Sequence, residues 1–133
     1  MPGTIPQAAA LAYRDGLICM VTSRSGRRWV LPKGQIELHQ SSRDAALAEA
    51  WEEAGLLGRV DDEPLGRFAY EKNEMIHEVA VYRMTVTTER AEWPEKNQRR
   101  REWVTVDEAM LRVEEPELKD IIPLLLVKRA TEG

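Results

Sequence analysis

The pattern of hydrophobic and polar residues predicts a series of short β-strands. β-forming residues such as Val79, Val81 and Val86 support this interpretation. The expected strands cover residues 7–14, 17–23, 29–31, 65–70, 77–87 and 102–106. Asp15-Gly16, between the first two of these segments, is a dipeptide typical of tight hairpin turns. The first two strands should therefore pair with each other.

The segment from Ser42 to Ala54 has the residues of a helix with defined ends. Ser41 suits the N-cap position, and Asp44 follows three residues later as the acid of a capping box. The segment is rich in alanine, and Gly55 suits the left-handed position just beyond the helix. One face is apolar and is expected to pack on the core; it carries Leu47, Ala50, Trp51 and Ala54.

Two more helices are expected near the end of the chain. Thr105 and Glu108 can form a capping box for a short helix at residues 107–111. A final helix is expected at residues 117–130, with Pro123 kinking or dividing it. Helices and strands in this order indicate an α/β sandwich.

Composition and charge narrow the class of protein. The 133 residues are 43% hydrophobic and 32% charged, which predicts one globular domain spanning residues 1–133. The net charge of −4 gives no general attraction to nucleic acid or to an anionic membrane, so neither is expected as a partner. The oligomeric state is left open.

The single cysteine and the apolar runs bear on location. Cys19 has no partner for a disulfide within the chain, which indicates a reducing compartment, the cytoplasm. The first residues lack the basic start of a signal peptide. The apolar run at residues 121–127 is too short to span a membrane.

Three carboxylates lie together near the end of the helix at residues 42–54. Glu49, Glu52 and Glu53 are spaced at i, i+3 and i+4, so they share a face with Cβ atoms about 5–6 Å apart. Like charges at this spacing cost a helix about 0.2–0.5 kcal/mol per pair, and they oppose the helix dipole. The cluster is either an ordinary solvated face or a site for a divalent cation. In both cases we expect Glu53 to lie off the core.

These residues belong to a stretch, LPKGQIELHQSSRDAALAEAWEEAGL, that resembles the Nudix box of the Nudix hydrolases. The box reads Gly, five residues, Glu, seven residues, Arg-Glu-hydrophobic-any-Glu-Glu-any-Gly-hydrophobic. Seven positions match in register: Gly34, Glu49, Ala50, Glu52, Glu53, Gly55 and Leu56. Gln40 stands in place of the first Glu, and Ala48 stands in place of the Arg, which in the family pairs with and orients box carboxylates.

The resemblance extends beyond the box. The segments TSRSGRRWVLPKG, MIHEVAVYRMTVT and RRREWVTVDEAM resemble the diphosphoinositol polyphosphate phosphohydrolase branch, which includes diadenosine polyphosphate hydrolases. The similarity covers most of residues 17–112. It implies a Nudix-type α/β/α sandwich, with a mixed β-sheet between helices.

The resemblance also implies a metal site and its chemistry. Nudix hydrolases cleave pyrophosphate bonds, and hard oxygen ligands suit Mg²⁺, with Mn²⁺ as an alternative. Glu49 and Glu53 are then the strongest candidate ligands, and Glu52 is a ligand or the catalytic base. The carbonyl of Lys33 is a further candidate ligand. Arg43 is about 140° round the helix from Ala48, so it is not expected to replace the missing Arg.

Basic residues near the box are candidates for holding the phosphates of a substrate. Guanidinium groups bind phosphate oxygens in a bidentate manner, and the resemblance favours Arg28 and Lys33, with Arg24 beside them. A solvated loop is the alternative. His77 matches a histidine of the same branch, although a lone histidine in a strand is more often structural. The run at residues 99–101 is expected to be a solvated edge, and Trp93 to cover the core.

Two functions from different classes remain. The first is metal-dependent hydrolysis of a pyrophosphate bond in a polyphosphorylated small molecule: a dinucleoside polyphosphate, an inositol pyrophosphate or another nucleoside diphosphate derivative. The second is a degenerate Nudix domain that binds a nucleotide or a protein with little or no turnover, which Gln40 and Ala48 motivate. Retention of all three glutamates favours the enzyme.

Overall fold

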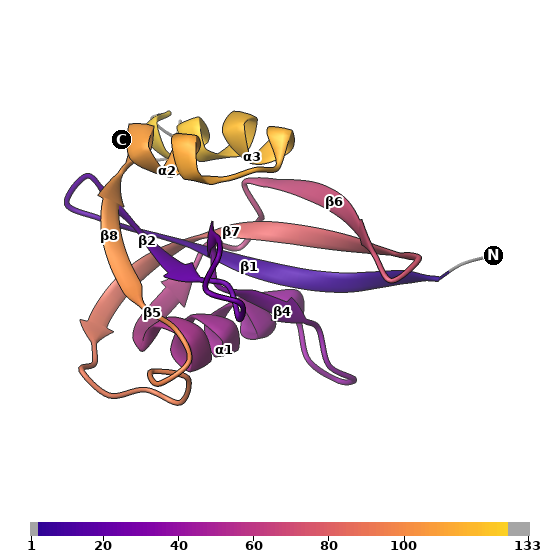
Figure 1. Cartoon of the computed structure of the whole chain (residues 1–133), viewed down its shortest axis with the longest axis horizontal. Helices are drawn as coiled ribbons and strands as arrows, with labels where there is room; N and C mark the ends of the chain where they lie inside the picture. The colour runs from indigo at the N-terminus through magenta and orange to yellow at the C-terminus, as the bar shows by residue number, and fades with distance from the viewer. Residues whose placement is uncertain (1–2, 128–133) are drawn as a thin grey trace.

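The computed structural model describes residues 3–127, which form a β-sheet with helices on both of its faces (Figure 1). Helix α1 lies below the sheet in this view, and helices α2 and α3 lie above it. The strands are β1 (Thr4–Arg14), β2 (Leu17–Thr22), β3 (Trp29–Val30), β4 (Lys33–Gln35), β5 (Leu56–Val60), β6 (Gly66–Lys72), β7 (Met75–Glu89) and β8 (Arg101–Thr105). The helices are α1 (Ser42–Ala54), α2 (Val106–Arg112), α3 (Pro116–Ile121) and the 3₁₀ helix η1 (Ile122–Leu126).

The two longest strands, β1 and β7, run parallel through the middle of the sheet. Strands β2 and β4 pair with β1, and β5 and β6 pair with β7, all antiparallel. The sheet is therefore mixed, as expected. The β1–β2 hairpin is also confirmed: Asp15 and Gly16 have φ angles of 53° and 78°, the left-handed values that a type I′ turn requires.

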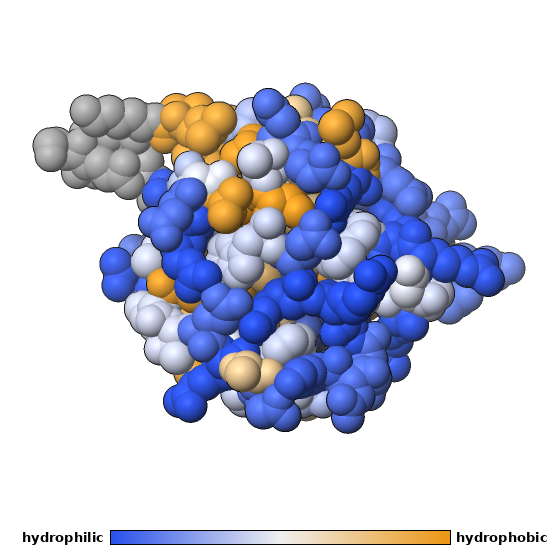
Figure 2. Space-filling model, turned by 60° about the vertical axis from the view of Figure 1, so that its left-hand side comes forward, coloured by the Kyte–Doolittle hydropathy of each residue, from blue (hydrophilic) through white to orange (hydrophobic). Residues whose placement is uncertain are grey.

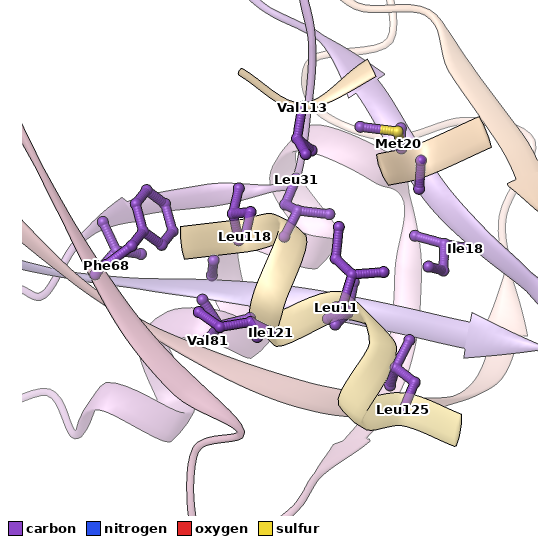
Figure 3. Close-up of a cluster of buried hydrophobic side chains, with 14 of the residues drawn as sticks. Leu11, Ile18, Met20, Leu31, Phe68, Val81, Val113, Leu118, Ile121 and Leu125 are labelled. Carbon is purple, nitrogen blue, oxygen red and sulfur yellow. The ribbon is translucent and has the colours of Figure 1, made fainter. Parts of the chain in front are cut away.

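Alternate residues of β1 serve two separate cores. Ala8, Ala10 and Ala12 face α1, whereas Leu11 faces the C-terminal helices. Figure 3 shows Leu11 and Val81 packed beneath the side chains of α3 and η1. Successive residues of one strand thus build both layers of the sandwich.

Helix α1 has the predicted bounds and the predicted caps. The Ser41 side chain accepts a hydrogen bond from the Asp44 N–H (3.0 Å), and Gly55 has a φ of 70°. The face that packs on the sheet is only partly the expected one: Ala50 and Ala54 are buried and Leu47 packs against the same core. Trp51 is only half-buried and belongs to neither core, while Glu53, expected to lie off the core, is 5% exposed. The helix is rotated because its alanines, not its tryptophan, face β1.

Other boundaries also differ from the sequence prediction. Strands β4 and β5 were not predicted, because each is short and is stabilised by a neighbouring strand, β1 or β7. The final helix ends early. Pro123 divides residues 116–126 into α3 and η1, as the position of the proline indicated. The predicted end of this helix, residues 128–130, lies outside the described residues.

The surface is mostly polar. On the face shown in Figure 2, hydrophobic side chains gather at the top, where the C-terminal helices lie, and the remainder is largely hydrophilic. Exposed apolar residues of that region are Leu111, Leu124, Leu126 and Val127. Within residues 3–127, none of the helices has the length and hydrophobicity needed to cross a bilayer.

Candidate active site

A cleft of about 690 Å³ collects most of the residues predicted to be functional. The predicted residues that line it are Arg24, Arg28, Lys33, Glu49, Glu52 and Glu53; His77 is not among them. A second cavity of about 570 Å³, lined by Arg43, Arg59 and residues 60–65, contains none of the predicted site residues. We therefore place the candidate active site in the first cleft.

Glu49 and Glu53 form the centre of this site. They lie one turn apart on α1, close enough that each carboxyl group affects the pKa of the other. The Lys33 N–H points at Glu53 Oε1 at 3.3 Å. Burial raises the pKa of Glu53 and also that of Glu49 above the ordinary value of a carboxyl, because two negative charges are unfavourable in this partly desolvated place.

Gly34 makes room for Glu49. A Cβ atom on Gly34 would lie 2.4 Å from Glu49 Cδ and 2.5 Å from its Oε1, well inside contact distance. Gly34 lies in β4, which is paired with β1 through Ala8. A residue without a Cβ atom is therefore favoured at the start of the box, because the Glu49 carboxylate lies directly against the backbone of Gly34.

Glu52 does not join the other two glutamates in one closed cluster. It lines the same cleft but is exposed. Among residues 3–127, no three carboxylates, imidazoles or thiolates converge as metal ligands would. The three glutamates thus line one cleft, with Glu53 buried, Glu49 half-buried and Glu52 exposed.

The donor chemistry nevertheless fits a hard cation. Glu49 and Glu53 offer carboxylate oxygens, the ligands that Mg²⁺ and Mn²⁺ prefer. Burial and the mutual repulsion of the two carboxylates raise both pKa values, so the charged form of the pair is disfavoured without a nearby positive charge. A divalent ion would supply that charge. The carbonyl of Lys33 stays a prediction as a third ligand.

The structure shows what surrounds the two departures from the box, Gln40 and Ala48. The side-chain oxygen of Gln40 accepts a hydrogen bond from the Glu37 N–H at 2.9 Å, so it stabilises the loop before α1. Arg43 donates to the carbonyls of Val60 and Asp61 and does not contact the glutamates. This agrees with the expectation that Arg43 does not replace the Arg absent at Ala48.

A different arginine reaches the glutamates. Arg99 is 9% exposed, and its guanidinium lies 3.5 Å from Glu53 Oε2 and 2.6 Å from Glu95 Oε1. The expectation of a solvated edge at residues 99–101 is therefore wrong for Arg99. Glu95 adds a further carboxylate to the cleft. Glu95 had no signal in the sequence, and nothing in the run at residues 99–101 indicated that Arg99 is buried, because both residues lie far beyond the box.

The predicted phosphate-binding residues differ in how freely they could act. Arg28 lines the cleft, but its guanidinium is ion-paired with Glu114 (3.0 Å) and Glu115 (3.1 Å). Lys33 Nζ lies 5.0 Å from the centre of the Tyr70 ring, and Arg24 is exposed. Lys33 and Arg24 are thus better placed than Arg28 to meet an incoming anion.

His77 lies beside the cleft. Its ring stacks on Tyr70, with ring centres 4.8 Å apart and an angle of 9° between the planes. Tyr70 lines the cleft and donates a hydrogen bond to Gln7 (2.8 Å). The described contacts of His77 therefore support a structural role behind Tyr70 more than a direct contact with substrate.

The sequence matches known proteins over most of its length. The model of the NUDIX domain matches residues 4–125. Nudix hydrolase 4 of Arabidopsis thaliana is 36% identical over 94 residues, which are 69% of this chain and 45% of that protein. Human diphosphoinositol polyphosphate phosphohydrolase 3-beta is 34% identical over 113 residues, which are 78% of this chain and 66% of that protein. The chain belongs to the NUDIX domain family.

Solved structures show the same fold. A crystal structure of Ap4A hydrolase from C. elegans has a TM-score of 0.76 at 14% identity, covering 93% of this chain and 97% of that one. A Nudix hydrolase from Nitrosomonas europaea has a TM-score of 0.74 at 17% identity, covering 98% and 100%. The α/β architecture with a mixed sheet is thus that of Nudix hydrolases, which generally use divalent metal ions.

The matching region is only part of some relatives. The chain spans about half the length of the first two curated Arabidopsis proteins that it matches. Family and fold follow from these comparisons, whereas the reaction and substrate are proposed below from the site.

Proposed function

We propose that this protein hydrolyses a pyrophosphate bond in a polyphosphorylated small molecule, using a divalent metal ion held by Glu49 and Glu53. The neighbouring carboxyl groups of Glu53, which is buried, and Glu49, which is half-buried, carry this proposal, in a cleft that also contains Lys33 and Arg24. Relatives named for diphosphoinositol polyphosphates and for Ap4A support the class of reaction.

Each residue has a role that follows from its place. The ion, Mg²⁺ or Mn²⁺, would polarise phosphoryl oxygens and activate a bound water. Lys33 and Arg24 would bind phosphate oxygens and orient the substrate. Glu52 is exposed in the cleft, which suits a group that takes up a proton from water and releases it to solvent.

The charges of the cleft favour a substrate with few phosphates. Arg28 and Arg99 are already paired with carboxylates, so the remaining cations that line the cleft are Arg24, Lys33 and Lys72. An inositol pyrophosphate carries more phosphates than three cations can bind, unless the pairs of Arg28 and Arg99 open. A dinucleoside polyphosphate, or another nucleoside diphosphate derivative, fits this number of cations better.

A phosphate-release assay tests the proposal. The panel contains a diadenosine polyphosphate, an inositol pyrophosphate, a nucleotide sugar and a capped RNA, each with Mg²⁺, with Mn²⁺ and with a chelator. We expect metal-dependent turnover of at least one substrate, with the diadenosine polyphosphate ahead of the inositol pyrophosphate, and loss of turnover in Glu53→Gln. Tight nucleotide binding without turnover would instead identify a binding module.

A further inference from the structure

The segment from Arg90 to Arg101 closes the C-terminal end of α1. The last four carbonyl groups of a helix lack partners within the helix. The last three carbonyls of α1 and that of Gly55 just beyond it each accept a hydrogen bond from this segment: Glu52 from the Glu95 N–H, Glu53 from Trp93 Nε1, Ala54 from Arg101 Nη1 and Gly55 from the Arg90 N–H, at 2.8–3.0 Å. The turn that carries Glu52 and Glu53 is thus fixed by a loop distant in sequence.

Arg99 is the residue of this loop that reaches the carboxylates themselves. Its guanidinium donates to Glu95 Oε1 (2.6 Å) and to the Thr22 carbonyl (2.9 Å), and it forms an ion pair with Glu53 Oε2 at 3.5 Å. The Arg99 N–H also donates to the Glu95 carbonyl (3.0 Å). Because Thr22 lies in β2, the side chain is anchored to the sheet and to the loop at once. Two hydrogen bonds fix the planar guanidinium, so its charge meets the Glu53 carboxylate in one orientation.

The other arginines of this run, Arg100 and Arg101, make different contacts. Arg100 is exposed, and its guanidinium lies 5.3 Å from the centre of the Trp29 ring. Arg101 binds backbone carbonyls and lies 4.2 Å from the Trp93 ring. Three consecutive arginines thus point to three different places, and within the described residues Arg99 is the arginine ion-paired with a candidate metal ligand.

We infer that Arg99 is a positioning residue for the metal site: it holds the Glu53 carboxylate in place from the loop, where Ala48 cannot do so from the helix. Glu53 then has one oxygen directed to the Lys33 N–H and the other to Arg99. The two oxygens of this carboxylate thus have different partners, one from β4 and one from the loop before β8. The inference deepens the proposed function and depends on Glu53 being a metal ligand.

Metal binding without substrate tests this inference, with Mn²⁺ alone as the probe in calorimetry. We expect Arg99→Gln to weaken Mn²⁺ binding by about 10–100-fold, the usual effect of losing a group that orients a ligand. If Arg99 acted by its charge alone, Arg99→Gln would instead tighten Mn²⁺ binding, because it removes a positive charge beside the cation site. Unchanged or tighter binding in folded Arg99→Gln would overturn the inference.

Arg100→Gln is the matched control, since it removes the adjacent guanidinium, which does not line the cleft. It should bind Mn²⁺ within about twofold of the parent. Denaturant unfolding of each metal-free variant shows whether it folds. If Arg99→Gln does not fold, Arg99→Lys is measured in its place. Lysine keeps the charge but not the fork, so it should also bind Mn²⁺ more weakly than the parent, and parental affinity would contradict the positioning role.

Ala48→Arg gives an independent test. Position 48 is where the family's box has the Arg that orients box carboxylates, so an arginine placed there can be tested for this role. If Arg99 already positions Glu53, Ala48→Arg should change Mn²⁺ affinity by less than about threefold in the parent and should raise it more in Arg99→Gln. An equal gain in both backgrounds, or a tenfold gain in the parent, would show that Arg99 does not fill this role.

These outcomes are separate from those of the proposed function. The Mn²⁺ measurement needs no substrate, so it remains decisive even if the substrate panel shows no turnover. Conversely, a parent protein that hydrolyses a pyrophosphate while Arg99→Gln binds Mn²⁺ normally would refute the inference alone. With an active substrate, Arg99→Gln should lower kcat about tenfold or more and change KM by less than about threefold, since the substrate contacts stay intact.

Discussion

The two faces of the sheet are packed in different ways. The face toward α1 is built largely of alanine: Ala8, Ala10, Ala12 and Ala80 from the strands meet Ala45, Ala46, Ala50 and Ala54 from the helix. The opposite face is built of larger side chains, among them Leu11, Ile18, Met20, Phe68, Leu118, Ile121, Ile122 and Leu125 (Figure 3). One strand, β1, contributes small and large residues in alternation.

We infer that one face of the sheet mainly stabilises the fold, whereas the other mainly positions the glutamates of α1. Burying large aliphatic side chains contributes about 1.5–3 kcal/mol each, so the face under α3 and η1 is the main source of hydrophobic stabilisation. Alanine adds less, but it lets the backbone of α1 lie close to the sheet. A helix held closely has little room to shift, which suits one that must place Glu49 and Glu53. We therefore expect the two faces to respond differently to substitution.

Leu11→Ala should have the largest effect, and on stability. Leu11 is fully buried in the large-residue core, so its truncation should cost about 2–5 kcal/mol in the free energy of unfolding. Mn²⁺ affinity, measured where the variant is folded, should stay within about twofold of the parent. Denaturant unfolding and calorimetry check both. A parallel loss of metal affinity would show that the two faces are not independent.

Glu53→Gln should have the converse effect. It removes a proposed ligand, so Mn²⁺ affinity should fall on the order of 100-fold. Stability of the metal-free protein should not fall, because the burial that raises the pKa of Glu53 disfavours its charged form. Glu117→Gln, an exposed substitution on α3, is the control and should alter neither quantity. Parental metal affinity in Glu53→Gln would reject Glu53 as a ligand.

Gly34→Ala should act on the site with little effect on the fold. The new methyl group would overlap the Glu49 carboxylate, which lies at the end of a flexible side chain and can move aside. The displaced carboxylate should lower Mn²⁺ affinity about tenfold, while the unfolding midpoint changes little. A large loss of stability would indicate that the backbone, not the side chain, has to shift.

Trp51→Ala should have the smallest effect, despite the size of the residue. Trp51 is half-buried and lies outside both cores, so we expect a loss of about 1 kcal/mol or less in denaturant unfolding. Had Trp51 packed on the sheet, as its helical position suggested, the cost would be about 3–5 kcal/mol. A loss in that range would mean that α1 is rotated relative to the described structure.

Local signals determined the parts of this protein that depend on a few neighbouring residues. The hairpin at Asp15-Gly16 and the caps of α1 at Ser41 and Gly55 were all predictable, because turn and cap geometry depends on backbone preferences within one turn. The box spacing likewise indicated the family and the glutamates. The short strands β4 and β5 were not predictable, since their hydrogen bonds come from strands distant in sequence.

The tertiary structure alone decided how the glutamates are placed. Helical periodicity leaves the rotation of α1 open, and close packing of alanines on β1 turned Glu53 inward and Trp51 partly outward. Sequence could not show that Arg99 lies against Glu53 or that Arg28 is bound by Glu114 and Glu115. These contacts join residues 46 and 86 or more positions apart, and only the folded sheet and its loops bring such residues together.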